Sequence, residues 1–375
     1  MKYKKIAIVY DWIDKWGGVE RVLLTLHEMF PKATFFTSVY NPLRAAWAKR
    51  LKIKTSFMQG LPGFIKRQRI ISTPLYPFAF ESFNFNEFDL VISVTSSFSK
   101  SIITQPGTLH VCYLLTPARF LWSHEKDYIR SPLARFLLGG YLDYLKSWDK
   151  TSAQRSDKII SISGAVKNRA KKYYGRDSGM IYPPFDTKYW TKIKNASLDP
   201  SVASLLQDDL KGGYFLIVSR LEPYKKIDLA TRVFNKRKEK LVIVGEGSEE
   251  KALKKISGKN IIFLSRLTDT ELSVLYKNAE ALIMTQEEDF GYVALEAAFF
   301  GSPVISYRKG GAREIIIEGR TGIFFDKQSE RSLQGAIERF AKIKYNLRTK
   351  TKKYGHDNVK RFDKEAFKKK LKAIL

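Results

Sequence analysis

The chain of 375 residues is poor in cysteine, in acidic residues and in long apolar runs. Its single cysteine, Cys112, excludes an internal disulfide and is typical of a protein kept in a reducing compartment. A membrane-spanning helix needs about 18 or more consecutive apolar residues, and the sequence has no such run. The apolar stretch near the amino terminus stops at Asp11 with no small-residue cleavage site after it, so we expect no signal peptide. These absences lead us to expect a cytoplasmic protein.

The scarcity of acidic residues leaves a formal net charge of +28, from 66 Lys and Arg against 38 Asp and Glu. Such a charge is compatible with an anionic membrane surface, an anionic substrate or nucleic acid. Basic residues gather at 49–54, 65–69, 167–176 and 368–372. The stretch GLPGFIKRQRII (60–71) mixes cations with apolar side chains, so a membrane-contact face and an ordinary solvated surface explain it about equally well. No nucleic-acid recognition signature is present, so we expect no nucleic-acid partner.

The length of the chain favours two domains over one hydrophobic core. Strand-like and helical patterns alternate from IAIVYDW (6–12) onward, and a second alternation begins at YFLIVSRL (214–221). This alternation predicts parallel sheets covered by helices on both faces. We therefore predict an α/β fold of two facing, doubly wound Rossmann-like domains with a ligand cleft between them. The predicted division is a first domain at 1–185, a linker at 186–200, a second domain at 201–355, and a basic C-terminal helix at 356–375 that can return to the first domain.

Glycine-containing turns follow predicted strands in both halves. Gly17 and Gly18 stand between the first strand and the next helix, where the missing side chains let a ligand approach the backbone closely. Tight helix–strand packing explains this pair equally well. VGEGS (244–248), which includes Gly247, is a second strand-to-helix glycine turn but lacks the full dinucleotide fingerprint.

Two cations follow the first strand of the second domain. Arg220 and Lys225 would stand at the carboxyl end of that strand, beside the start of a helix. The planar fork of arginine and the point charge of lysine suit a diphosphate. Ordinary surface cations are the alternative interpretation of this pair taken alone.

The stretch LIMTQEEDFGYVALEAAFFGSPVISYRKGG (282–311) places two carboxylates, Glu288 and Glu296, around a helix that should begin near Gly291. A helix N-terminus offers free N–H groups and a positive dipole end to a phosphate. One carboxylate stands on the loop and the other about one turn into the helix. Because the carboxyl ends of parallel strands meet at one edge, these segments together predict a cradle for a phosphorylated sugar nucleotide.

The order of SRLEPYKKIDLA, VGEG and the E-x7-E pair resembles that of the retaining glycosyltransferases of family 4, which have two facing Rossmann-like domains, the GT-B fold. The resemblance extends over nearly the whole chain. Further motifs resemble bacterial mannosyltransferases that build O-antigen and other surface polysaccharides. These motifs are GGVER (17–21), VTSSFSKS (94–101), TPARFLW (116–122) and MIYPP (180–184).

The resemblance implies roles for individual residues. Arg220 and Lys225 would bind the donor diphosphate, Glu288 the hydroxyls of the donor sugar, and Glu296 the nucleotide ribose. The residues implied as catalytic are Arg220, Lys225 and Glu288. The further donor-binding residues are Gly17, Gly18, Gly247, Phe290, Gly291, Tyr292, Val293 and Glu296.

The resemblance also implies an acceptor site in the first domain, for which we name Arg119, Trp122 and His124. The subgroup usually has a histidine near the transferred sugar and an aspartate further on, where this chain has Leu115 and Ser123. A surface position for His124 is the alternative to a role as substitute for that histidine.

The expected reaction is transfer of a hexose with retention, from a nucleotide sugar to a glycan or a polyprenyl-diphosphate-linked acceptor. GDP-mannose is the favoured donor and a UDP-sugar the alternative. We expect no cofactor and no metal, because two protein cations serve the diphosphate and no Asp-x-Asp signature follows a strand. A peripheral position on the inner face of the plasma membrane fits such an acceptor. Two other functions stay open: a nucleotide-sugar epimerase of the same fold, and a non-catalytic protein that binds glycan or nucleotide sugar.

Overall fold

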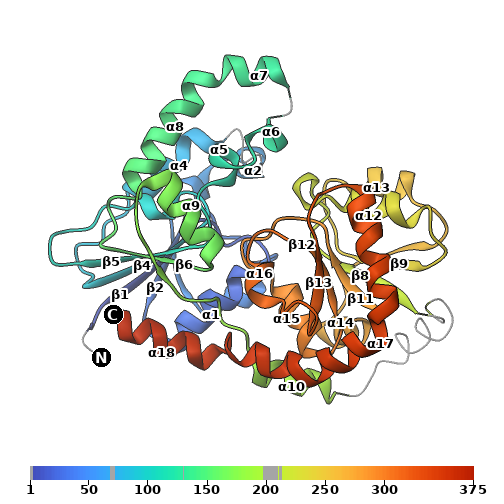
Figure 1. Ribbon diagram of the computed structural model, residues 1–375. Coiled ribbons are helices and arrows are strands. Elements are labelled where there is room, and N and C mark those ends of the chain that lie inside the picture. Colours follow the sequence, from blue (N-terminus) through green and yellow to red (C-terminus); the bar gives the residue numbers. More distant parts are fainter. Residues whose placement is uncertain (1–2, 68–71, 130, 197–209, 211–212) are drawn as a thin grey trace. The chain divides into compact units, whose positions relative to one another are not determined.

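The computed structural model describes all residues except 1–2, 68–71, 130, 197–209 and 211–212 (Figure 1). The chain divides into two compact units. Unit 1 comprises Met1–Pro184 and Phe367–Leu375, and unit 2 comprises Phe185–Ala366. Each unit is an α/β domain with its own parallel sheet.

Unit 1 is built on a seven-stranded sheet of order β3-β2-β1-β4-β5-β6-β7, in which every neighbouring pair is parallel. Its central strands are buried along their whole length, as expected for a sheet covered on both faces. The strands are β1 (Ile6–Tyr10), β2 (Thr34–Thr37), β3 (Lys52–Thr55), β4 (Leu90–Thr95), β5 (Leu109–Leu114), β6 (Lys158–Ser161) and β7 (Gly179–Met180). The α-helices are α1 (Val19–Met29), α2 (Gly63–Arg67), α4 (Tyr76–Glu81), α5 (Arg119–Trp122), α6 (Glu125–Tyr128), α7 (Pro132–Leu137), α8 (Gly139–Ser152) and α9 (Gly164–Tyr174).

The edge strand β3 has no counterpart in the sequence-based assignment, which interpreted residues 49–54 only as a basic cluster. Its residues Lys52–Thr55 alternate between exposed and half-buried, because an edge strand has one side open to solvent. Charged residues on an edge strand also discourage pairing with another chain. At least part of this basic cluster therefore has a structural explanation.

Unit 2 is built on a six-stranded parallel sheet of order β10-β9-β8-β11-β12-β13. Apolar residues from the strands and the long helix α17, among them Ile243, Ile283 and Phe340, form its main core. The strands are β8 (Tyr214–Val218), β9 (Lys240–Val244), β10 (Ile261–Leu264), β11 (Ala281–Met284), β12 (Val304–Tyr307) and β13 (Gly322–Phe325). The α-helices are α10 (Thr187–Lys194), α12 (Ile227–Phe234), α13 (Glu250–Ile256), α14 (Asp269–Asn278), α15 (Tyr292–Phe299), α16 (Ala312–Ile315) and α17 (Glu330–Lys360). A last helix, α18 (Lys364–Ile374), follows α17.

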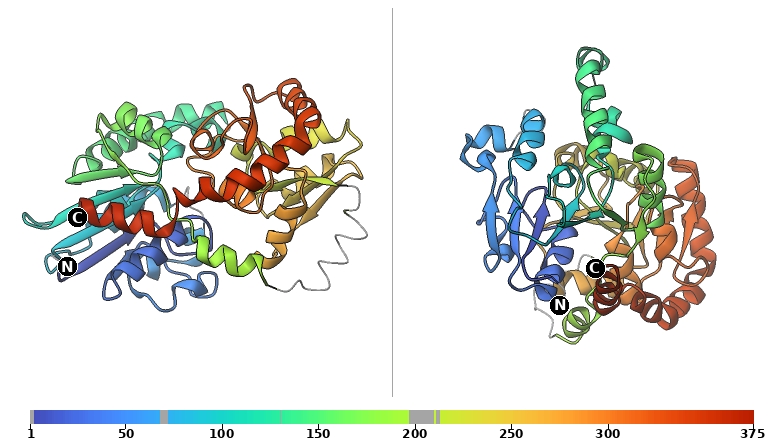
Figure 2. Two further views of the ribbon diagram at one scale, coloured as in Figure 1. Left: turned by 60° about the horizontal axis from the view of Figure 1, so that its bottom comes forward. Right: turned by 90° about the vertical axis from the view of Figure 1, so that its left-hand side faces the viewer.

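These two parallel-sheet α/β domains and the helical C-terminal tail confirm the predicted fold class. The end of the tail packs on unit 1. The ring centroids of Phe367 and Tyr113 are 5.6 Å apart, and Lys158 Nζ donates to the carbonyl of Ile374 at 2.6 Å. Tyr3 Oη donates to the carbonyl of Leu375 at 2.8 Å, so the described ends of the chain lie side by side (Figure 2).

The segment 186–200, predicted as a linker, differs from that expectation over its described part. Residues Thr187–Lys194 form α10, and the Asp186 side chain caps this helix by accepting from the Tyr189 N–H at 2.9 Å. Trp190 is fully buried and stacks on Phe185. This aromatic packing makes α10 part of unit 2 and not a linker. Residues 197–200 lie outside the described residues.

Candidate functional site

The strand order of unit 2 defines where a ligand is expected. In a doubly wound sheet, ligands bind at the carboxyl ends of the strands, at the point where the strand order reverses. Here the first strand, β8, lies between β9 and the fourth strand, β11. The loops that follow β8 and β11 carry Arg220, Lys225 and Glu288.

Lys225 and Glu288 form an ion pair in which Lys225 Nζ donates to Glu288 Oε1. The two side chains are only 9% and 17% exposed, so water screens the pair weakly. Gln286 Nε2 donates to the same carboxylate oxygen at 2.8 Å, and the Thr285 hydroxyl donates to the Lys225 carbonyl at 2.8 Å. The structure thus brings two of the predicted catalytic residues together. Gln286 and Thr285 were not identified from the sequence, because amide and hydroxyl side chains there carry no motif of their own.

Glycines hold the backbone of Glu288 close to a neighbouring loop. The Gly311 N–H donates to the Glu288 carbonyl at 2.7 Å. A Cβ atom added at Gly310, where φ is +73°, would lie 2.0 Å from that same carbonyl oxygen. Only glycine fits this close approach. The position of the Glu288 loop therefore depends on the GG pair that ends the stretch 282–311.

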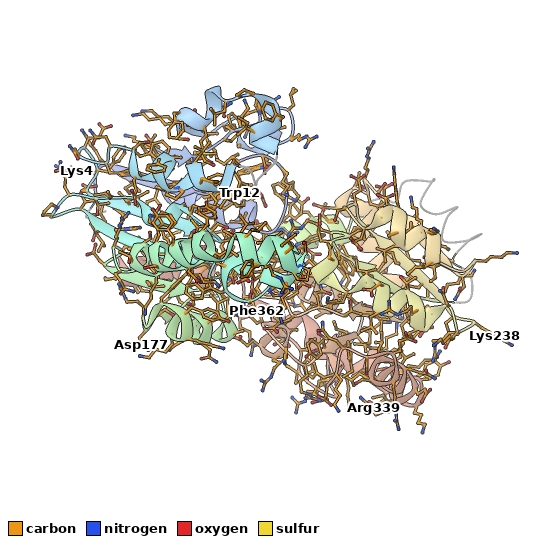
Figure 3. The ribbon with its side chains drawn as sticks, turned by 90° about the horizontal axis from the view of Figure 1, so that it is seen from above. Lys4, Trp12, Asp177, Lys238, Arg339 and Phe362 are labelled. Carbon is orange, nitrogen blue, oxygen red and sulfur yellow. The ribbon has the colours of Figure 1, made fainter. Side chains whose placement is uncertain are left out.

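Helix α15 begins directly after this loop. Gly291 is its N-cap residue with φ +105°, and Tyr292 and Val293 open the first turn, whose N–H groups have no acceptor within the helix. Phe290 is buried, with its ring centroid 5.2 Å from that of Tyr292 and 5.6 Å from that of Phe362. Phe362 is labelled in Figure 3. This packing gives Phe290 a role in holding the loop, beside its predicted place in the donor site.

Glu296, the second carboxylate of the E-x7-E pair, is only 3% exposed. Its Oε2 accepts a hydrogen bond from Tyr276 Oη at 2.7 Å. Tyr276 in turn stacks on Phe300, with ring centroids 6.1 Å apart. Both members of the pair thus have identified protein partners, and the partner of Glu296 belongs to helix α14.

Arg220 lies at the surface, where its guanidinium donates to Tyr224 Oη at 2.7 Å. Gly247 has a packing reason to be glycine, since an added Cβ would lie 2.3 Å from the Leu221 carbonyl oxygen. The VGEG turn therefore lies against the backbone that carries Arg220. Its predicted contact with the donor stays a prediction.

Gly17 and Gly18, in unit 1, precede helix α1, of which Gly18 is the N-cap residue. Beside them lies Glu20, which is 4% exposed. Burial raises the pKa of the Glu20 carboxyl to about 7, although hydrogen bonds from the backbone of Glu20 and Gly17 act in the opposite direction. Glu20 was not singled out from the sequence, because an acidic residue in the first turn of a helix is usually a solvated partner of the helix dipole.

The predicted acceptor residues Arg119 and Trp122 lie on helix α5. Trp122 Nε1 donates at 2.7 Å to Asp149, a fully buried carboxylate that also accepts from Lys100 Nζ and, at 2.8 Å, from Tyr174 Oη. Burial and the Asp149 carboxylate raise the pKa of Tyr174 well above its usual value. Trp122 therefore has a structural role in unit 1. The Lys100–Asp149 pair was not predicted, because these residues are 49 positions apart.

His124 is half-buried, and its Nδ1 lies 2.8 Å from the Ser123 hydroxyl. Leu115, at the end of β5, is also half-buried, and its N–H donates to the Thr95 carbonyl at 2.8 Å.

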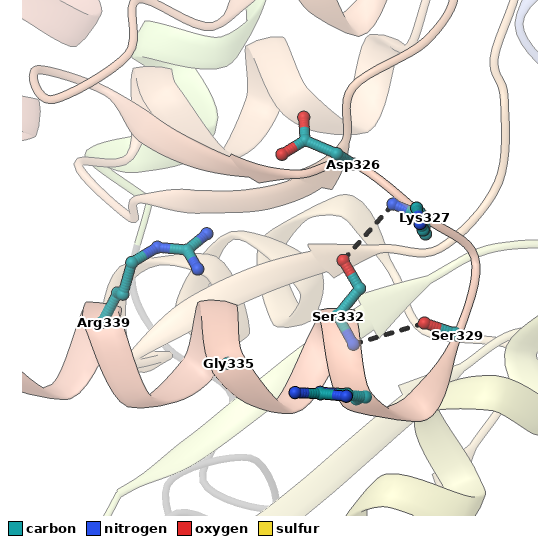
Figure 4. A pocket seen from close by; sticks show the side chains of 7 residues that line it. Asp326, Lys327, Ser329, Ser332, Gly335 and Arg339 are labelled. Carbon is teal, nitrogen blue, oxygen red and sulfur yellow. Dashed lines mark hydrogen bonds between the residues drawn. The ribbon is translucent and has the colours of Figure 1, made fainter.

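A pocket of about 370 Å³ lies elsewhere in unit 2, at the start of helix α17 (Figure 4). It is lined by Asp326, Lys327, Ser329, Arg331, Ser332, Gly335 and Arg339. None of the predicted site residues lines it. Over the described residues there is also no cluster of three or more His, Cys, Asp or Glu side chains arranged to hold a metal ion. Likewise, none of the described helices is long and apolar enough to span a membrane.

Comparison with known proteins identifies the family to which unit 2 is related. Residues 206–358 match the family model of glycosyl transferases group 1. The chain is 26% identical over 238 residues to an uncharacterized glycosyltransferase of Methanocaldococcus jannaschii, a match that covers 60% of this chain and 58% of that protein. It is 26% identical over 197 residues to the alpha-1,3/1,6-mannosyltransferase ALG2 of Dictyostelium discoideum, covering 43% of this chain and 46% of ALG2. The chain thus spans about half the length of these curated relatives.

Solved structures extend the likeness to both units. The crystal structure of Anabaena HepE in complex with UDP matches with a TM-score of 0.71 at 17% identity, over 99% of each chain. At this identity the match establishes the fold. Residues 206–358 thus resemble the glycosyl transferases group 1 domain, in a chain that has the two-domain GT-B fold.

Proposed function

We propose that this protein is a retaining glycosyltransferase that transfers a mannosyl group from GDP-mannose to a hydroxyl of a glycan or of a polyprenyl-diphosphate-linked oligosaccharide. The observation that carries the proposal is the buried Lys225–Glu288 pair beside the N-terminus of α15, at the carboxyl edge of a glycosyl transferases group 1 domain. The likeness to ALG2, a mannosyltransferase, supports mannose as the transferred sugar.

The cationic residues of the site stabilise charge in the reaction, whereas Glu288 orients the sugar. In the reaction, the bond from the sugar C1 to the diphosphate breaks, and a bond from C1 to the acceptor oxygen forms on the same face. The acceptor proton passes to the departing phosphate oxygen. Negative charge grows on that phosphate, where fixed positive groups stabilise the transition state most. Lys225, Arg220 and the free N–H groups of α15 supply such groups, which makes a bridging metal unnecessary.

Glu288 has the complementary task of accepting hydrogen bonds from the sugar hydroxyls. Its ion pair with Lys225 keeps both side chains in place before the donor arrives. The diphosphate then becomes a second anionic partner of Lys225. Because Gln286 also donates to Glu288, the carboxylate keeps one fixed donor when the lysine turns toward the phosphate.

Helix α7 of unit 1 supports a membrane-bound acceptor. Leu133, Phe136 and Leu137 are 66%, 83% and 72% exposed. Helices α7 and α8 project from the sheet of their unit (Figures 1 and 2). An exposed apolar helix on a strongly basic protein suits an anionic lipid surface, so we place the enzyme peripherally on the inner face of the plasma membrane.

The membrane contact is tested by sedimentation with vesicles of phosphatidylglycerol and phosphatidylcholine. The double variant Phe136→Ser, Leu137→Ser should lose most vesicle binding. Tyr345→Ser, at an 80% exposed aromatic residue of α17 in unit 2, is the control and should bind as the wild type does. Equal binding of all three proteins would contradict the role of α7.

The activity is tested by incubation with nucleotide sugars, with and without a lipid-linked oligosaccharide acceptor. We expect release of GDP from GDP-mannose and an α-linked product, which NMR spectroscopy of the anomeric proton identifies. An epimer formed from the donor alone would instead identify an epimerase. Tight binding of the donor without transfer or hydrolysis would identify a non-catalytic binding protein.

A further inference from the structure

Three charged side chains occupy equivalent positions in consecutive loops of unit 2. Arg220, Glu246 and Arg266 each stand two residues after the last residue of their strand, β8, β9 and β10. These strands are neighbours in the sheet. The charges therefore alternate in sign along its carboxyl edge.

The strand register places the three positions in one row. Val218 is paired with Val244, and Val244 with Leu264, so the last residues of the three strands are aligned. Backbone hydrogen bonds continue past the strands, from the Ser219 N–H to the Val244 carbonyl at 3.0 Å and from the Gly245 N–H to the Leu264 carbonyl at 2.9 Å. The aligned strand ends therefore place the backbone of the three positions in neighbouring loops at one edge of the sheet.

The charges that follow β9 and β10, Glu246 and Arg266, form a contact that stability alone does not explain. Arg266 Nε donates to Glu246 Oε1 at 3.1 Å, with side chains 87% and 52% exposed. An ion pair so exposed contributes little to stability. Arg266 also has φ +57°, and only Lys226 shares a positive φ among the non-glycine residues described. Strained backbone of this kind clusters at ligand sites.

We propose that Glu246 and Arg266 recognise the base of the donor, and that this base is guanine. The inference rests on the proposed function, which places the diphosphate at Arg220 and Lys225 beside β8. Strand β10 lies two strand spacings away, roughly 10 Å, a distance that a ribose and a base can span. The nucleoside would then extend along the row of charges from β8 to β10.

Guanine fits this pair because of the groups on its edges. Its N1–H and exocyclic N2 amino group are adjacent donors, which one carboxylate can accept together. Its O6 and N7 are adjacent acceptors, which the fork of an arginine matches. Glu246 would accept from N1 and N2 while Arg266 donates to O6 and N7. Uracil has a single ring N–H between two carbonyls, so it cannot give Glu246 a second hydrogen bond.

Calorimetric titration of the full chain with GDP and with UDP tests the proposal. The wild type should bind GDP more tightly. Glu246→Gln should weaken GDP binding by on the order of 10- to 100-fold, the range for loss of a bidentate base contact, while UDP binding changes less than about twofold. Arg266→Ala should weaken GDP binding in the same selective way. Glu250→Gln, at a carboxylate on α13 that pairs with Lys254, is the matched control and should leave both affinities unchanged.

Each outcome has a distinct meaning. A wild type that prefers UDP would overturn this inference and the choice of GDP-mannose as the donor, but not the transferase reaction itself. A Glu246→Gln variant that weakens GDP and UDP binding equally, or weakens neither, would overturn this inference alone. Binding of neither nucleotide would overturn the transferase proposal as well. Thermal unfolding of each variant establishes that lost binding does not come from a lost fold.

Discussion

Lys225 and Glu288 are 63 residues apart in the chain and form an ion pair shielded from solvent in unit 2. Lys225 follows β8 and Glu288 follows β11, two strands that are neighbours in the sheet but not in the sequence. In this pair, Lys225 is the residue expected to bind the diphosphate, and Glu288 is the residue expected to bind the sugar. A change at one residue should therefore affect both folding and donor binding.

Lys225→Ala should lower the free energy of unfolding by about 3 kcal/mol, because it leaves a largely buried carboxylate without its cation. Urea denaturation measures this loss, and calorimetric titration should show donor binding at least about 100-fold weaker, as expected when a charge-assisted contact to phosphate is removed. Lys254→Ala removes a lysine whose pair with Glu250 is far more exposed, and should change stability by less than about 1 kcal/mol. Equal losses in the two variants would contradict the special position of Lys225.

Glu288→Gln keeps the size of the side chain and its ability to hydrogen-bond, but removes its charge. We expect a folded protein whose transfer rate falls by about 100- to 1,000-fold, the range for loss of one preorganised electrostatic contact. The rate is measured as GDP released in the presence of acceptor. Glu280→Gln, at a carboxylate 3.6 Å from Lys344, serves as control and should retain full activity. Normal turnover by Glu288→Gln would end the assignment of the donor site.

Gly310→Ala and Gly319→Ala form a matched pair, because the two glycines have almost the same φ, +73° and +72°. A Cβ at Gly310 would lie 2.0 Å from the Glu288 carbonyl oxygen, whereas nothing lies within 4 Å at Gly319. Gly319→Ala should cost about 1 kcal/mol of stability from backbone strain alone. Gly310→Ala should cost clearly more and should also reduce kcat/KM, since it displaces the Glu288 loop. Similar values for both variants, by denaturation and kinetics, would contradict the close approach.

Glu20 should make the stability of the protein depend on pH. Its carboxyl has a pKa raised from 4.5 to about 7, so the folded state keeps the proton after the unfolded state has lost it. The contribution of Glu20 to stability is therefore fully present below pH 4.5, falls between pH 4.5 and about 7, and is smaller by roughly 3 kcal/mol above that window. Glu20→Gln cannot ionise and should remove most of this dependence, as urea denaturation at pH 5 and pH 8 would reveal. Glu87→Gln, at an exposed carboxylate, should keep the wild-type dependence.

Trp122→Phe separates a structural role from an acceptor role. It removes the indole donor to the buried Asp149 carboxylate, so we expect a loss of about 2 kcal/mol in the free energy of unfolding. Trp47→Phe removes a more exposed hydrogen bond to the Lys15 carbonyl and should cost less than about 1 kcal/mol. An unchanged stability of Trp122→Phe, together with a higher KM for the acceptor, would assign this residue to acceptor binding instead.

The sequence by itself determined the elements whose local signals are strong. Helix α14 has a strong local signal, because Thr268 and Glu271 form a capping box at its start. Strand β13 is likewise a short apolar run, GIFF, and is buried along its whole length. The alternation of such elements was enough to predict two parallel α/β domains, since parallel strands need helical crossovers between them.

Where the local sequence signal is weak or mixed, tertiary packing determines whether a segment forms a strand or a helix. Strand β3 is edge structure with exposed lysines, and α10 depends on the burial of Trp190 against Phe185. The alternating lysines of β3 and the short aromatic segment of α10 do not by themselves predict these elements, because the packing of each depends on residues distant in the chain. The same reason explains why the Lys100–Asp149 pair was not anticipated.

Residue identity pointed to Lys225 and Glu288 separately, as a cation after one strand and a carboxylate after another. That they touch was decided only by the tertiary structure, through the strand order that places β8 beside β11. The row formed by Arg220, Glu246 and Arg266 has the same origin, since the register of β8, β9 and β10 aligns loops that the sequence keeps more than 15 residues apart. The sequence shows which charged residues follow each strand. Which of these residues come into contact depends on which strands are hydrogen-bonded neighbours in the sheet.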